Sequence, residues 1–204
     1  EIDAAGGRFF QRASTPDPVM VVAWPPRAAV ASGYSSLAER CYHRGMGTVI
    51  RGSGHFVPER VVTNEELAPQ IGTTPEWIEQ RTGILERHYI SPGESNASLA
   101  EEASRRALDE AGWSPADVDA IILCTLSSDA VFPGSGVYLA ARLGLKRTPA
   151  MDVRNQCSGF LYGLSVADAW LAAKRYRRVL LVGSEVHSTS LDFTPPGRNV
   201  TALF

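Results

Sequence analysis

The chain has 204 residues, of which 44% are hydrophobic and 21% are charged. This is the composition of an ordinary globular protein, and it excludes a disordered chain, a collagen-like repeat and a disulfide-stapled mini-protein. Its 20 Lys and Arg stand against 22 Asp and Glu, which gives a formal net charge of -2. No strong electrostatic field therefore points to nucleic acid or to an anionic membrane as a partner.

Residues 1–45 differ in pattern from the rest of the chain. They are rich in Ala, Arg, Pro and Gly, no helical or strand period in them lasts more than a few residues, and 19–24 is their one apolar patch. Met46 then opens an apolar run that looks like a fresh protein start. We therefore predict an irregular leader over 1–45, added as a non-native extension, and a folded domain over 46–204. The chain ends on the apolar run 201–204, which predicts a strand. Because natural termini are usually polar, we expect the domain to be truncated at its C-terminal end.

The first part of the predicted domain contains one strand and two short helices. Residues 48–53 are strand-like, and 54–58 turn the chain. Asn64 begins a helix with acidic residues in its first turn, and Pro75 occupies the first helical position of the next helix. Residues 86–90 are predicted to form a short extended arm.

The second part alternates helices and strands. A capping box that begins at Ser98 predicts a helix to Ala111. Further helices are predicted over 135–143 and 158–176, and the last is apolar on nearly all sides, which is typical of a central helix. Strands are predicted over three runs, of which the first and last are typical of strands covered on both faces: 120–124, 150–153 and 179–183. This alternation predicts an open, layered α/β sheet of mixed or parallel order.

The three cysteines, Cys41, Cys124 and Cys157, form neither a CxxC pair nor a Cys/His cluster at zinc spacing. Neither a disulfide nor a metal site is therefore predicted, and a reducing, cytoplasmic compartment fits best. The longest apolar runs are of strand length, well short of the ~20 residues that a membrane helix needs. No membrane partner is expected.

Cys157 stands between a short predicted strand and a long predicted helix. The unpaired backbone N–H groups and the positive dipole end at a helix N-terminus favour a thiolate there, and a thiolate can form a thioester with an acyl group. The alternative is a small buried cysteine that only packs, the commoner role of this residue type. Cys124, in the middle of an apolar run, is predicted to pack. Gly159 and Gly163, one helical turn apart, leave one helix face open to close approach.

Several spaced motifs between Met46 and Phe204 are together highly specific. They are Gly52-Ser53-Gly54, Val57-Pro58-Glu59, Glu76-Trp77-Ile78, Arg81-Thr82-Gly83-Ile84, Glu86-Arg87-His88, Phe132-Pro133, Asp152 through Gly159, Leu164 through Asp168, and Val182-Gly183-Ser184-Glu185. In these motifs the sequence resembles the N-terminal half of the β-ketoacyl-acyl-carrier-protein synthase III family of condensing enzymes. The resemblance implies a thiolase-like, layered αβαβα fold, present in its N-terminal half only.

The resemblance also implies a reaction. Cys157 would take an acyl group from acyl-CoA, and a carbanion made by decarboxylating malonyl-acyl carrier protein would attack the acyl thioester, initiating fatty acid or polyketide synthesis. Acyl-CoA enters as a substrate, and neither a permanently bound cofactor nor a metal is implied. The family's catalytic His and Asn lie in the C-terminal half, so the chain as given is expected to be inactive in condensation.

The resemblance assigns four residues to coenzyme A. Trp77 and Arg81, at positions i and i+4 of one predicted helix, would sandwich the adenine; without the family context they are a surface aromatic–cation pair. Thr73 would lie near the nucleotide, unless it only caps the helix. Arg198, expected in a loop before the last strand, would also contact the adenine end.

Phe132 matches a residue that reaches across a homodimer and closes the partner's acyl pocket, unless Phe132-Pro133 only packs within its loop. Before the nucleophile, Arg154-Asn155-Gln156 replaces the small residues typical of housekeeping members of the family. Two alternatives therefore stay open. One is an acyltransferase that acts on an alcohol or amine without condensation, and the other is an inactive truncated fragment that binds acyl-CoA.

Overall fold

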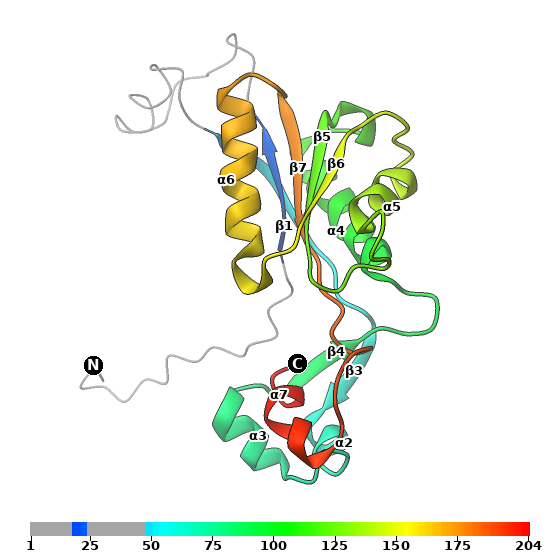
Figure 1. Cartoon of the computed structure of the whole chain (residues 1–204), viewed down its shortest axis with the longest axis vertical. Coiled ribbons are helices and arrows are strands. Elements are labelled where there is room, and N and C mark those ends of the chain that lie inside the picture. Colours follow the sequence, from blue (N-terminus) through cyan, green and yellow to red (C-terminus); the bar gives the residue numbers. More distant parts are fainter. Residues whose placement is uncertain (1–17, 24–47) are drawn as a thin grey trace, which may run out of the picture. The chain divides into compact units, whose positions relative to one another are not determined.

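The computed structural model describes residues 48–204 and the strand at residues 18–23. These residues form two compact units, whose elements are labelled in Figure 1. The larger unit contains Glu94–Glu185 together with the described residues up to Phe56, and the smaller unit contains Val57–Gly93 and Val186–Phe204. Each unit has its own hydrophobic core.

The larger unit is built on a five-stranded sheet with the order β2-β1-β7-β5-β6. β5, β6 and β7 are parallel, and β1 pairs antiparallel with both β2 and β7. The strands are β1 Pro18–Ala23, β2 Val49–His55, β5 Ala120–Cys124, β6 Ala150–Val153 and β7 Arg178–Gly183. The predicted α/β sheet is therefore confirmed, with a mixed strand order.

β1 lies within the stretch that the sequence pattern predicts to be an irregular leader. Its residues pair with β2 on one side and with residues 178–181 of β7 on the other. The prediction of an irregular leader is therefore wrong for residues 18–23, because a short apolar run can pair between two strand edges however isolated it is in the sequence. The rest of the predicted leader, Cys41 included, lies outside the described residues.

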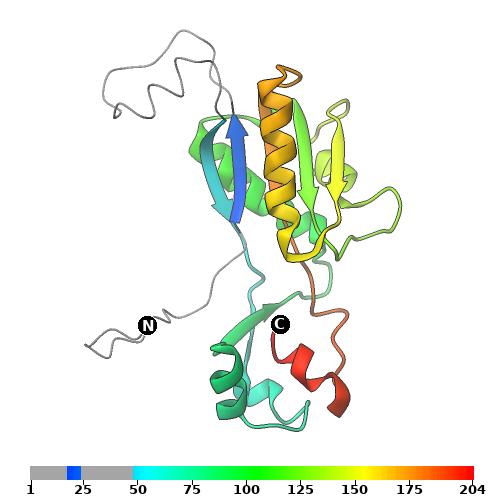
Figure 2. The ribbon, with the colours of Figure 1, turned by 60° about the vertical axis from the view of Figure 1, so that its left-hand side comes forward.

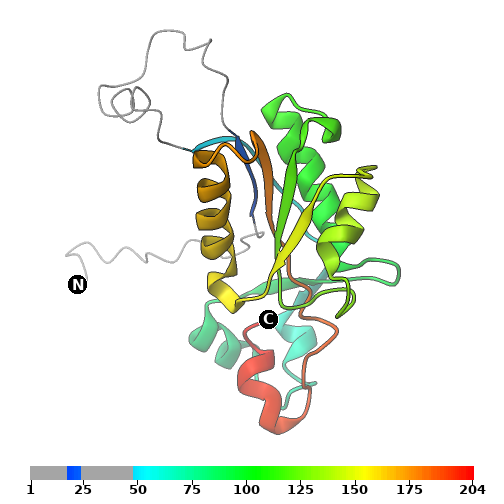
Figure 3. The same cartoon turned by 45° about the horizontal axis from the view of Figure 1, so that its top comes forward.

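Helices cover both faces of this sheet (Figure 2), and Figure 3 shows the same layers from another direction. They are α4 Asn96–Ala111 and α5 Ser135–Arg142 on one face, and α6 Gly159–Ala172 on the other. Alternate residues of β5 pack into the hydrophobic clusters on the two faces of the sheet. Ile121 and Leu123 pack with α4 and α5, whereas Ile122 and Cys124 pack with α6. This period of two is that of a strand buried on both faces.

α6 is less buried than its composition predicts. The residues that it buries lie on one face, at every fourth position: Gly159, Gly163, Ala167 and Leu171. On the outward side, Leu161 is 64% exposed and Tyr162 is 56% exposed. The prediction of a central rather than superficial helix is therefore wrong within the described residues, because apolar composition does not fix how many neighbours cover a helix. α6 ends at Ala172 rather than near residue 176.

α4 begins at Asn96 rather than at Ser98. Its N-cap is Ser95, whose Oγ accepts from the Ser98 N–H, while the Ser95 N–H donates to the Ser98 Oγ. Two serines thus form the capping box, and the predicted box between Ser98 and Glu101 is wrong.

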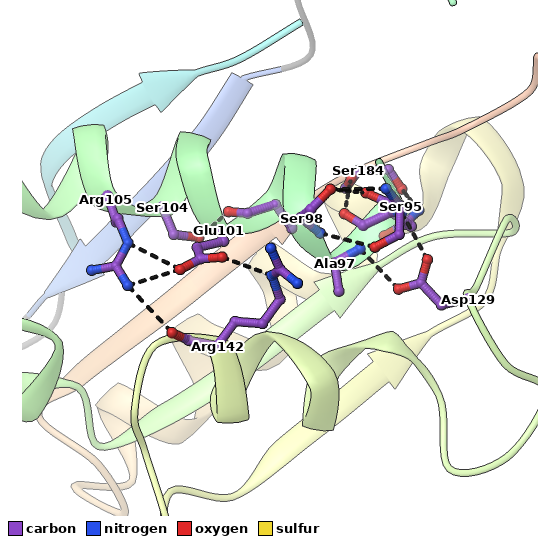
Figure 4. A network of polar contacts seen from close by, with 11 residues as sticks. Ser95, Ala97, Ser98, Glu101, Ser104, Arg105, Asp129, Arg142 and Ser184 are labelled. Carbon is purple, nitrogen blue, oxygen red and sulfur yellow. Dashed lines mark hydrogen bonds and ion pairs between the residues drawn. The ribbon is translucent and has the colours of Figure 1, made fainter. Parts of the chain in front are cut away.

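Glu101 instead connects α4 to α5 (Figure 4). Its carboxylate pairs with Arg105 at 2.8 Å within α4 and with Arg142 of α5 at 2.7 Å. Burial raises the pKa of Glu101, but the hydrogen bonds from the two guanidiniums outweigh it and leave the pKa lowered.

Two glycines of β2 allow α4 to contact the backbone of the sheet. A Cβ added at Gly54 would overlap the carbonyl oxygen of Ala103 and the nitrogen of Ala107, and one added at Gly52 would overlap the carbonyl oxygen of Ala107. Helix and strand therefore approach at a distance that only glycine permits.

The smaller unit contains a two-stranded antiparallel sheet and short helices. Its elements are β3 Arg60–Thr63, β4 Glu86–Tyr89, α2 Asn64–Leu67, α3 Pro75–Thr82 and α7 Arg198–Thr201. Its core consists of Val62, Leu67, Ala68, Ile71, Ile78, Tyr89 and Ala202. Three 3-10 helices complete the two units: Pro115–Asp117, Gln156–Ser158 and Pro195–Gly197.

The predicted extended arm at 86–90 is confirmed as β4, but the strand expected at 201–204 is wrong. Thr201 ends α7, and a turn follows it. Ala202 is buried in the core, and the carbonyl of Phe204 accepts a hydrogen bond from the Tyr89 hydroxyl at 3.3 Å. Apolar residues here serve a helical turn, which a four-residue run cannot distinguish from a strand.

Candidate active site

Cys157 follows the carboxyl end of β6 and precedes α6. It lies in the short 3-10 turn at 156–158, and its side chain is exposed. The preceding Gln156 has φ +40°, in the left-handed region that non-glycine residues rarely adopt. Such a conformation costs on the order of 1 kcal/mol and persists only where the surroundings impose it. The turn therefore holds the thiol in an accessible position at some conformational cost.

The N-terminus of α6 begins two residues after this thiol. Its N-cap residue, Ser158, makes no side-chain capping hydrogen bond. The Gly159 N–H donates instead to the carbonyl of Gln156 in the preceding turn, and the positive end of the helix dipole lies beside the position where a thiolate would form. The alternative of a buried, merely packing residue is wrong for Cys157, while its role as nucleophile stays a prediction.

Cys124 shows the opposite behaviour. It is 5% exposed and packs under α6, where a Cβ at Gly163 would lie 2.5 Å from its Sγ. Gly163 thus allows the close approach that was predicted from the glycine spacing. Burial, reinforced by the carboxylate of Asp152, raises the pKa of the Cys124 thiol from 9.0 to about 12. The prediction that Cys124 packs is confirmed.

This difference predicts selective alkylation. At pH 9, iodoacetamide should modify Cys157 and spare Cys124, because a thiol with a pKa of about 12 is roughly five-hundredfold less ionised at that pH than a thiol with the ordinary pKa. Peptide mapping by mass spectrometry measures both sites, and both should react in denaturant. Equal labelling of both thiols in the folded chain would contradict the assignment.

The raised pKa of Cys124 also makes folding stability depend on pH. The folded state keeps the proton that the unfolded state releases near pH 9.0, so the stability that Cys124 contributes is present below pH 9.0 and is lost as the pH rises toward about 12.

Phe132 stands at the tip of the segment 125–134 between β5 and α5, which we call the tip loop. Val131 is 88% exposed and Phe132 is 89% exposed, and the Phe132-Pro133 peptide bond is cis. Because Phe132 reaches outward, the alternative that it packs within its own loop is wrong. An apolar side chain this exposed is a candidate contact for another surface.

Three carboxylates to which the sequence pattern gave no role hold the tip loop. Glu185 accepts hydrogen bonds from the N–H groups of Leu126 and Ser127, at 2.6 and 3.1 Å. Asp129 and Asp152 bind backbone N–H groups at the starts of α4 and α5. Asp152 and Glu185 stand within two of the motifs that carry the resemblance, but nothing in the sequence indicates which N–H groups their carboxylates reach.

In the smaller unit, Trp77, Arg81 and Arg198 come together. The guanidinium carbon of Arg81 lies 5.3 Å from the Trp77 ring centroid, and that of Arg198 lies 5.1 Å from it. Arg198 begins α7 rather than lying in a loop, and it donates to the carbonyl of Gly72 at 3.2 Å. Two cations at one indole form a site where a planar, electron-rich ring bearing anionic groups could bind.

Thr73 is next to this cluster but does not cap a helix. Its N–H donates to the carbonyl of Ala68 at 3.0 Å. The residue that caps α3 is Thr74, whose hydroxyl accepts from the Trp77 N–H at 3.3 Å. The alternative that Thr73 is the cap is therefore wrong, and its contact with a nucleotide stays a prediction.

None of the helices described within 48–204 is long and apolar enough to cross a membrane. In the same part of the chain, no group of three or more His, Cys, Asp and Glu side chains is placed to hold a metal ion.

Comparison with known proteins finds similarity to one kind of enzyme. A family model for 3-oxoacyl-[acyl-carrier-protein] synthase III matches residues 151–204. The β-ketoacyl-[acyl-carrier-protein] synthase III of Bordetella petrii is 48% identical over 161 residues, which cover 76% of this chain and 48% of that protein. The corresponding protein of Methylococcus capsulatus is 47% identical over 144 residues, which cover 71% of this chain and 45% of that protein.

The fold gives the same result. The crystal structure of 3-oxoacyl-[acyl-carrier-protein] synthase III from Aquifex aeolicus matches with a TM-score of 0.72 and 36% identity, over 76% of this chain and 49% of that one. The resemblance found in the sequence motifs and the thiolase-like α/β fold are therefore confirmed. The chain spans about half the length of the curated relatives it matches.

Proposed function

We propose that this chain, which resembles 3-oxoacyl-[acyl-carrier-protein] synthase III over about half of that enzyme's length, binds acyl-CoA and takes its acyl group onto Cys157. The acyl group would then condense with malonyl-acyl carrier protein to begin a fatty acid or polyketide chain. The observation that carries this proposal is the exposed thiol of Cys157 beside the uncapped N-terminus of α6.

In the first step the Cys157 thiolate attacks the carbonyl carbon of the acyl-CoA thioester. A new carbon–sulfur bond forms, the bond to the coenzyme A sulfur breaks, and coenzyme A leaves as the thiol after protonation. Charge develops on the carbonyl oxygen, where the backbone N–H of Cys157 and the positive end of α6 stabilise it.

In the second step malonyl-acyl carrier protein loses CO2, and the resulting carbanion attacks the acyl thioester. The product is a β-ketoacyl-carrier protein, and the Cys157 sulfur is released. The resemblance assigns this step to a His and an Asn of the C-terminal half. The residues of this chain would therefore carry out the acyl transfer and bind coenzyme A.

Coenzyme A fits the cluster of the smaller unit by its chemistry. An adenine ring stacks on indole and on guanidinium planes, and phosphates pair with guanidinium groups. Trp77 supplies the indole, and Arg81 and Arg198 supply guanidinium groups within about 5 Å of its ring. Thr73 is next to this cluster. We place the adenine on Trp77 and extend the proposal to a homodimer in which Phe132 closes the acyl pocket of the partner.

Replacing Trp77 tests the coenzyme A site. Trp77→Ala should weaken the binding of coenzyme A by about tenfold to a hundredfold, because stacking of a base on an aromatic side chain is worth ~1–3 kcal/mol. Titration calorimetry measures the affinity. Trp113→Phe is the matched control, since Trp113 also carries a guanidinium, that of Arg178 at 5.1 Å, but lies in the larger unit. An unchanged affinity in Trp77→Ala would contradict the assignment.

A further inference from the structure

The tip loop is anchored to three different elements of the larger unit. Glu185, just after β7, binds its start, as described above. Its middle and its end are held by Asp129 and Asp152, and its most exposed large apolar side chains lie between Asp129 and Gly134. The loop is thus fixed at both ends with an exposed apolar tip, Val131 and Phe132.

Asp129 connects the loop to the start of α4. Its carboxylate accepts from the N–H groups of Asn96 and Ala97, at 2.7 and 2.9 Å, and Figure 4 shows it beside Ala97. Ser135 completes this contact, because its hydroxyl donates to the Asp129 carboxylate and accepts from the Asp129 N–H. Ser135 is fully buried, so Asp129 ties the middle of the loop to a residue enclosed by the fold.

Asp152 connects the other end of the loop to β6. Its carboxylate accepts from the N–H of Ser135 at 2.7 Å and from the N–H of Gly136 at 2.8 Å. The N-cap of α5 is Gly134, which has no side chain to cap the helix. The capping group of α5 therefore comes from a neighbouring strand, and a Cβ at Gly134 or Gly136 would overlap it.

We propose that Asp152 is a positioning residue that fixes the Phe132 tip relative to the strand that carries Cys157. Asp152 is the third residue of β6, and the chain reaches Cys157 five residues later. The Asp152 carboxylate thus links the strand that leads to the turn at 156–158 with the tip loop, through two short, charge-assisted hydrogen bonds. The position of Phe132 should in turn affect which acyl chains are accepted. This part rests on the proposed function, in which Phe132 closes an acyl pocket and must be preorganised to do so.

Hydrogen exchange on the 204-residue chain tests the positioning directly. Asp152→Asn keeps the shape of the side chain, but it loses the negative charge and presents an NH2 group to one of the two N–H donors. Exchange in peptides covering 126–137 should become about tenfold faster or more. Glu110→Gln is the matched control, because Glu110 accepts from the N–H and hydroxyl of Ser53 in the same unit, and it should leave those peptides unchanged.

Acylation tests the functional consequence. With acyl-CoA substrates of two to eight carbons, Asp152→Asn should change the ratio of Cys157 acylation rates between the longest and shortest chains by about tenfold, and Glu110→Gln should not. If Asp152→Asn fails to fold, Gly136→Ala displaces the same carboxylate and should give the same local change. Unaltered exchange in the tip loop, or an equal increase throughout the sheet, would overturn the proposal. If the parent chain accepts no acyl group, the proposed function fails, and hydrogen exchange alone decides the role of Asp152.

Discussion

Incubation of the 204-residue chain with acetyl-CoA should add one acetyl group, and Cys157→Ala should abolish the adduct. Cys157 is exposed beside the uncapped N-terminus of α6, whereas burial raises the pKa of the other described thiol, Cys124, to about 12. Removal of a catalytic nucleophile costs several orders of magnitude in rate. Intact mass measures the number of adducts, and peptide mapping locates them.

A second variant controls for Cys124, the other thiol among the described residues. Cys124→Ala removes the buried sulfur without touching the turn at 156–158, and it should acylate at nearly the rate of the parent chain. An acyl adduct that persists in Cys157→Ala would show that the nucleophile is a different residue. An adduct lost equally in both variants would point to damage to the fold rather than to loss of a nucleophile.

Gly54→Ala should destabilise the larger unit by about 3 kcal/mol, at the upper end of overpacking effects. The added methyl would overlap the backbone oxygen of Ala103 and the backbone nitrogen of Ala107. Backbone atoms within a helix cannot move aside as the end of a side chain can. α4 would therefore have to lift from the sheet and lose packing against the core between them. Urea denaturation followed by circular dichroism measures the free energy of unfolding.

Gly159→Ala is the matched control for this prediction. A Cβ there would lie 3.7 Å from the Cβ of Cys124 and 3.8 Å from the carbonyl of Val153, which are ordinary van der Waals distances. The substitution should change the free energy of unfolding by no more than about 1 kcal/mol. If Gly54→Ala were as stable as Gly159→Ala, the close approach of α4 to β2 would be wrong.

The sequence pattern predicted the elements that local composition determines. β5 and β6 have the bounds expected for short apolar runs, and α5 begins at the expected residue. The start of α4 was misplaced because Ser95 and Ser98 can both cap a helix, and only the folded backbone selects Ser95. The burial of α6 and the pairing of β1 depend on which elements pack against them, and composition does not contain that information.

The candidate site divides in the same way. Cys157 before a helix, and Trp77 with Arg81 at helical spacing, are local patterns, and they could be predicted. The contact of Arg198 with Gly72 joins residues 126 positions apart, and no local pattern predicts it. The resemblance to a known family supplied only the expectation that Arg198 contacts the adenine end of coenzyme A. The carboxylate of Asp152 reaches N–H groups 16 and 17 residues earlier in the chain. No periodicity announces such a contact, so it became apparent only in the fold.

The place of β1 has a practical consequence for how this protein is handled. In the described residues β2 has no strand neighbour other than β1, and β7 uses β1 on the side opposite to β5. A shorter chain that began at Met46 would retain α4 against β2, but it would leave a gap one strand wide in the middle of the sheet. Two facing rows of unpaired peptide groups would border that gap and invite an added strand from any other polypeptide. A chain that begins at Met46 would thus have two unpaired strand edges where an internal strand had been. A fragment meant to stay monomeric therefore has to begin upstream of Pro18.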